Sequence, residues 1–161
     1  MKKISILSIG ALVTILIACG GPDKTETTNA ATEQPKSMVE DPPKYDPHRG
    51  EGKWTAENVK LNDPLNQEWV ASGENIANVK CASCHKFTKE KLVGPGWKGV
   101  TTRRSPEWIM NFITNPDPML DKDPEAQAML ELCLVRMPNQ SLEDMEARVI
   151  LEFLFKNDGK K

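Results

Sequence analysis

The chain has 161 residues, a length typical of a single domain. Its 21 basic and 23 acidic side chains nearly cancel, and only 6% of the residues are aromatic. The balanced charge gives no indication of nucleic acid binding, so we expect none. A small domain with few aromatic side chains builds a limited apolar core, and a large buried cofactor would supply much of the missing apolar contact.

Residues 1–18 have the features of an export signal. Lys2 and Lys3 precede an apolar stretch that is too short for a membrane-spanning helix. Leu-Ile-Ala-Cys then resembles a bacterial lipobox, in which Cys19 becomes the lipidated N-terminus. We therefore expect a lipoprotein signal peptide, and an exported chain that lipid on Cys19 anchors to the periplasmic side of a bacterial membrane. The alternative is an ordinary signal peptide whose cleavage site happens to contain a cysteine.

Residues 19–62 are expected to form a lipidated tether and an extended arm. Residues 20–44 are rich in Thr, Pro and charged side chains, and they cannot bury enough apolar surface to offset the entropy of ordering. This composition predicts a flexible tether. Residues 45–62 contain Trp54, Val59 and Leu61, which indicate an arm that lies on the following domain. A fully disordered extension is the alternative for this segment.

Residues 63–161 have the pattern of an all-α domain of about four to five helices, with no strand pattern. Each expected helix begins with a side chain that can cap backbone N–H groups, and in three cases Pro follows in the first turn. The last start is a capping box in which Asp144 takes the place of the preferred Glu. The expected starts are Asn62-Asp63-Pro64, Ser105-Pro106, Asp123-Pro124 and Ser141, and the second helix is expected to end near Asn115-Pro116.

The sequence Cys81-Ala-Ser-Cys84-His85 predicts a haem attachment site. Two thiols at this spacing can form thioethers with the two vinyl groups of one haem, and the adjacent imidazole then binds the iron. A redox dithiol of the thioredoxin type would need a strand before the motif, and a zinc site would need a second ligand pair that the chain lacks. We therefore expect one covalent haem c per chain, attached to Cys81 and Cys84, with His85 as an axial ligand.

The sixth iron ligand must come from elsewhere in the chain. A thioether sulfur favours reduced iron and raises the potential, which suits electron transfer. Met137 stands in a loop between two expected helices and precedes a proline, so we predict that it binds the iron. Met119 and Met129 remain candidates. Cys133 has leucines around it, so we expect a small buried apolar residue; an exposed thiol that links two molecules is the alternative.

Residues 63–158 resemble a class I cytochrome c. The resemblance rests on the haem motif and four further stretches: Gly73-Glu-Asn-Ile, residues 92–100 with Trp97 in place of the usual Leu of a Gly-Pro-x-Leu-x-Gly loop, Arg136-Met137-Pro138, and residues 150–154. It implies a small cytochrome c fold, a close crossing of the first and last helices at Gly73 near Phe153, and a hydrogen bond from His85 to the carbonyl of Pro95. Trp97 would either reach a haem propionate or belong to the core.

The resemblance also implies a monomeric carrier of single electrons rather than an enzyme. The carrier would transfer electrons from a membrane quinol-oxidising complex to a terminal reductase or oxidase. Residues 108–116 and 136–139 are similar to lipoprotein cytochromes associated with nitrous oxide reduction. The alternatives are a haem sensor or enzyme with an open iron site, and a fixed haem subunit of a larger oxidoreductase.

Charge is segregated along the domain. Residues 80–104 hold seven basic residues and one acidic residue, whereas residues 117–146 hold eight acidic and two basic ones. Opposite charges on the two sides of one haem would orient the molecule in the field of a partner. We therefore expect redox proteins to dock on the basic surface around Lys80–Arg104.

Overall fold

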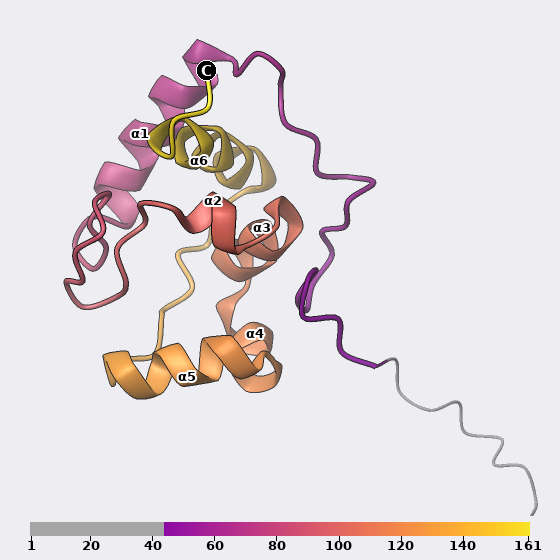
Figure 1. The fold of residues 1–161 in the computed structure, drawn as a ribbon, viewed down its shortest axis with the longest axis vertical. Helices are drawn as coiled ribbons and strands as arrows, with labels where there is room; N and C mark the ends of the chain where they lie inside the picture. Colours follow the sequence, from indigo (N-terminus) through magenta and orange to yellow (C-terminus); the bar gives the residue numbers. More distant parts are fainter. Residues whose placement is uncertain (1–43) are drawn as a thin grey trace, which may run out of the picture. The chain divides into compact units, whose positions relative to one another are not determined.

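The computed structural model describes residues 44–161; the expected signal peptide, Cys19 and the tether as far as residue 43 lie outside the described residues. The prediction of an all-α domain is confirmed, because the described residues contain six helices and no strand (Figure 1). None of the helices in this part of the chain is long and apolar enough to cross a membrane. The helices are α1 (Gln67–Lys80), α2 (Val100–Arg103), α3 (Pro106–Thr114), α4 (Pro116–Lys122), α5 (Pro124–Cys133) and α6 (Asp144–Asn157).

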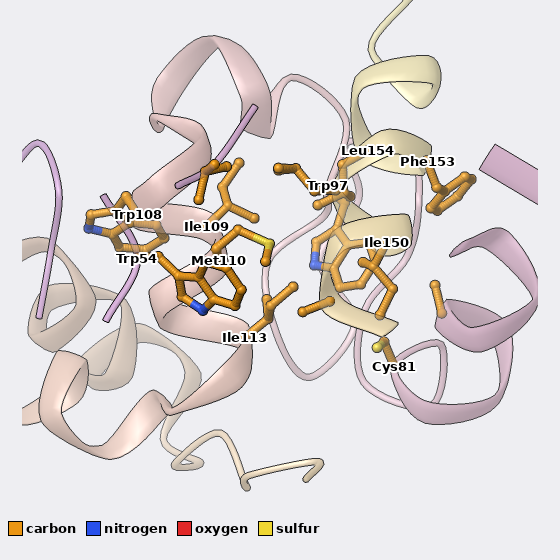
Figure 2. Packing of buried hydrophobic residues seen from close by; sticks show 14 of the residues in the cluster. Trp54, Cys81, Trp97, Trp108, Ile109, Met110, Ile113, Ile150, Phe153 and Leu154 are labelled. Atoms are coloured by element: carbon orange, nitrogen blue, oxygen red, sulfur yellow. The ribbon is translucent and has the colours of Figure 1, made fainter. Parts of the chain in front are cut away.

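The core forms where α1 and α6 cross. A Cβ atom added at Gly73 would lie only 2.0 Å from the carbonyl oxygen of Val149, so the two backbones touch at this point. Only glycine permits this approach. The contact lies about one helical turn before Phe153. Buried side chains of α3 and α6 then meet around Trp97 (Figure 2).

Two of the expected helix starts agree with the structure. Ser105 Oγ accepts a hydrogen bond from the backbone N–H of Trp108 at 3.1 Å, which caps α3. Asp123 Oδ1 accepts from the backbone N–H groups of Glu125 and Ala126 at 2.9 and 2.8 Å, which caps α5. These caps satisfy N–H groups that have no partner inside the helix.

The other two starts were wrong by a few residues. The helix α1 begins after Asn66, whose side chain accepts from the N–H groups of Glu68 and Trp69. Asn62 does not cap the helix, because its side chain and its backbone N–H both donate to the buried carboxylate of Glu152. The helix α6 begins after Glu143 rather than at Ser141, since Ser141 has a φ of 49°. The short helices α2 and α4 were not expected.

Residues 44–62 lie on the helices as an extended arm, drawn in indigo and purple in Figure 1. Trp54 and Val59 are buried in the core cluster. The side chain of Asn111, on α3, fixes the backbone of the arm: its Oδ1 accepts from the N–H of Trp54 at 2.9 Å, and its Nδ2 donates to the carbonyls of Arg49 and Trp54 at 3.0 Å. Because Asn111 is 1% exposed, water does not compete for these bonds.

Candidate haem site

The cysteine motif follows α1 directly. The backbone N–H groups of Cys84 and His85 both donate to the carbonyl of Cys81 at 3.0 Å, which turns the chain sharply after the helix. The N–H groups of Val93 and Gly94 donate to the carbonyl of Cys84 at 3.2 and 2.9 Å. The loop after the motif thus folds back onto it. Cys81 is buried and Cys84 is partly exposed.

The ring of His85 is held in one orientation by this loop. Its Nδ1 lies 2.9 Å from the carbonyl oxygen of Pro95, the contact that the resemblance implies. A Cβ atom added at Gly94 would lie 2.3 Å from Cε1 of the ring, so the backbone of Gly94 passes against its edge. The ring of Trp97 lies 5.2 Å away, centroid to centroid.

These contacts prepare His85 for metal binding. Burial lowers the pKa of His85, and the hydrogen bond to the carbonyl of Pro95 only partly opposes this effect. The imidazole is therefore neutral at neutral pH. With Nδ1–H donating to Pro95, Nε2 carries the free lone pair, and a carbonyl partner of this kind fixes the orientation of a ligating histidine.

Three neighbouring cavities are lined by both His85 and Met137. The first has apolar walls that include Phe112, Leu120 and Leu130. The second is lined by Trp97, Trp108, Arg103 and Arg104, among others. The third is lined by Cys81 and Cys84. The motif and the methionine loop thus face a shared space.

This space fits a haem. Its walls are mostly apolar, as a flat porphyrin ring requires. Both thiols open onto it. Arg103, which also lines the second cavity, is a suitable partner for a carboxylate of the group. Trp97 both lines the cavity and stacks on Phe87, so it belongs to the core and to the site.

The structure separates the candidate methionines. Met137 is partly exposed and lines all three cavities, whereas Met129 lines the first two. Met119 is fully buried against the arm, and its sulfur accepts the backbone N–H of Glu51 at 2.9 Å. Met119 lines none of these cavities, so Met137 and Met129 remain as candidate ligands.

The expectation that Cys133 is buried was wrong. Its side chain is partly exposed and lines the first cavity. The neighbouring Leu132 and Leu134 do not cover it, because they are 73% and 85% exposed. The last turn of α5 lies beside the loop after the cysteine motif, where Lys91 Nζ donates to the carbonyl of Leu132 at 2.6 Å.

The two charged segments are paired in part with each other. Arg104, from the basic segment, forms an ion pair with Glu125 of α5 and lies over the ring of Trp108. Lys80 pairs with Glu146 at 3.0 Å. Exposed basic side chains remain around a separate groove, which is lined by Lys89, Lys91 and Arg103 among others. The basic surface is therefore smaller than the sequence indicated.

The sequence did not identify the polar residues that hold the walls of the site. Asp123 is 1% exposed and accepts hydrogen bonds from Tyr45 and from Trp108 Nε1, the latter at 2.9 Å. Arg136 binds Asp117 and Asp121 on α4. Only the capping position of Asp123 was visible in the sequence, because its other partners come from distant segments.

Comparison with solved structures identifies the fold. No protein-family model and no curated protein matches the chain. The cytochrome c from Rhodothermus marinus is 29% identical with a TM-score of 0.62, and the match covers 66% of this chain and 91% of that one. An engineered form of the same cytochrome c is 29% identical with a TM-score of 0.60, covering 65% and 90%. The chain has the cytochrome c fold and carries a covalently attached haem c.

Proposed function

We propose that the chain carries single electrons, with the haem attached through Cys81 and Cys84 and its iron bound by His85 and Met137. The observation that carries the proposal is that His85 and Met137 line the same three cavities, one of which both cysteines also line. Bound in this way, the haem iron supplies reversible uptake and release of one electron. Similarity to the cytochrome c from Rhodothermus marinus supports the same function.

The protein residues act by holding the site constant. Pro95 orients the imidazole of His85 through Nδ1, and mostly apolar walls surround the site. If His85 and Met137 both held the iron, no position would remain for a substrate, which would favour a carrier over an enzyme. A thioether ligand and apolar surroundings would both favour the reduced state.

The cellular setting of the proposal comes from the sequence. Lipid on Cys19 would hold the exported chain at the periplasmic side of a membrane, and the tether would let it reach partners. We propose a membrane quinol-oxidising complex as donor and a terminal reductase or oxidase as acceptor. The stretches at 108–116 and 136–139 favour a terminal step in nitrous oxide reduction.

Carbon monoxide binding tests the proposal against a sensor or enzyme with an open iron site. We expect the native ferrous holoprotein to bind carbon monoxide slowly, because Met137 must first leave the iron. Met137→Ala should bind it at least tenfold faster and lose the sulfur-to-iron absorption band of the ferric protein; tenfold corresponds to about 1.4 kcal/mol. Met129→Ala is the matched control and should behave like the native protein. Rapid binding by the native protein would contradict the proposal. If only Met129→Ala accelerated binding, Met129 rather than Met137 would be the iron ligand.

A further inference from the structure

The residue before Met137 is bound to a separate helix. Arg136 Nε lies 2.9 Å from Asp117 Oδ1, and Arg136 Nη2 lies 2.8 Å from Asp121 Oδ1. Nη2 also donates to the backbone carbonyl of Asp117 at 3.3 Å. One planar guanidinium group thus binds two carboxylates of α4, an arrangement that arginine supports better than lysine.

The rest of the methionine loop has few such contacts. Leu134 and Val135 are 85% and 53% exposed, and the side chains of Asn139 and Gln140 bind only their own loop. Within the described part of the chain, Arg136 provides the only side-chain hydrogen bonds that join residues 134–140 to a helix. The position of the loop relative to the cavity therefore depends on Arg136 and on apolar contacts.

The helix α4 is a firm support for this contact. Met119 is fully buried, and a Cβ atom added at Gly50 of the arm would lie 2.6 Å from its sulfur. Lys122 and Glu51 form an ion pair of 3.2 Å between α4 and the arm. Leu120, on the same helix, lines the first cavity beside Met137. A group attached to α4 is thus attached to the cavity wall.

We propose that Arg136 is a positioning residue for Met137: by binding Asp117 and Asp121 it fixes the backbone next to the sulfur ligand against the wall of the haem cavity. The inference rests on the proposed role of Met137 as the axial ligand. Isolated exposed ion pairs contribute little, but one group shared by two carboxylates forms a network whose members hold each other in place. Fixing the backbone in this way would stabilise the bond between the iron and the sulfur of Met137.

Arg136→Gln in the holoprotein tests the proposal. We expect the ferrous variant to bind carbon monoxide about two- to fivefold faster than the native protein. The sulfur-to-iron absorption band of the ferric variant should weaken at a pH where the native band is intact. Lys53→Gln is the matched control, because it removes the same charge from an exposed ion pair between the arm and Asp144 of α6. The control should leave both measurements unchanged.

Two further variants separate positioning from a general loss of stability. Arg136→Lys should recover part of the native behaviour, because an ammonium group can still reach one carboxylate. Asp117→Asn/Asp121→Asn should reproduce the effect of Arg136→Gln, and combining all three changes should add little. Native carbon monoxide binding and an intact band in Arg136→Gln would overturn this inference alone. If the native protein already behaves like Met137→Ala, the proposed axial ligand and this inference are both overturned.

Discussion

The two sides of the haem cavity are held together in different ways. On the side of His85, groups close in sequence bind each other: ring Nδ1 of His85 contacts the carbonyl of Pro95 at a separation of ten residues. On the side of Met137, side chains from distant segments make the contacts: Arg136 binds Asp117 across 19 residues, and Tyr45 binds Asp123 across 78. The first side is a local structure, whereas the second depends on the packing of the arm, α4 and α5.

The largest loss of stability is expected when a side chain is added on the side of His85. Gly94→Ala places a methyl group 2.3 Å from Cε1 of His85, and the ring cannot move freely because Pro95 holds its other edge. Overpacking of this kind costs about 3 kcal/mol at the upper end of its usual range. We expect the holoprotein to unfold at lower denaturant concentration and its absorption spectrum to show a disturbed iron–histidine bond.

Gly73→Ala is the control, because it adds the same methyl group at a backbone contact away from His85. Its methyl group would lie 2.0 Å from the carbonyl oxygen of Val149, at the crossing of α1 and α6. The loss of stability should be similar, yet the absorption spectrum of the folded fraction should remain native. If Gly94→Ala and Gly73→Ala disturb the spectrum equally, the contact of Gly94 with His85 has no special role.

A smaller loss of stability is expected when Asp123, on the side of Met137, is replaced. Burial raises the pKa of the Asp123 carboxyl, but hydrogen bonds from Tyr45, Trp108 and the N–H of Ala126 outweigh burial and lower it below its usual value. A carboxylate with a lowered pKa stabilises the fold above the pKa of the unfolded chain, and the contribution is lost as the pH falls through the folded value. Asp123→Asn should cost about 2 kcal/mol at pH 7, because Trp108 Nε1 or Tyr45 then loses its acceptor.

Denaturant unfolding at several pH values measures this contribution. The difference between the native protein and Asp123→Asn should shrink below about pH 4, where the carboxyl of the unfolded chain takes up a proton before that of the folded protein does. Asp144→Asn, at an exposed carboxylate, is the control and should change stability by less than about 0.5 kcal/mol. A constant difference from pH 7 down to pH 3 would show that the charge of Asp123 is not what stabilises α3 and α5.

The same contrast explains how far the sequence alone could lead. The all-α fold, the caps of α3 and α5 and the haem motif were predictable because each depends on residues a few positions apart. The hydrogen bond between His85 and Pro95 came from the resemblance, which also describes a local loop. The choice among Met119, Met129 and Met137 stayed open, since only packing shows that Met119 is enclosed by the arm. The hydrogen bonds of Asn111 and Arg136 could not be predicted, because their partners lie in segments that come together only in the folded chain.

The smallest expected effect concerns the surface charges of the two sides. On the side of Met137, Arg136 neutralises Asp117 and Asp121 internally, and Glu125 is paired with Arg104. Lys89, on the side of His85, is exposed and has no ion pair within residues 44–161. If a partner docks on the basic surface, the field that steers it comes from such unpaired side chains.

Lys89→Glu should therefore slow electron transfer to an acidic redox partner about two- to fivefold at low ionic strength, and the difference should vanish at high salt because exposed charges are screened. Lys60→Glu, an equal charge reversal on the exposed arm, should have a smaller effect. Arg104 is unsuitable for this test, since reversing its charge would also break its pair with Glu125 of α5. Equal slowing by Lys89→Glu and Lys60→Glu would mean that net charge, rather than the basic surface beside the haem, governs the encounter.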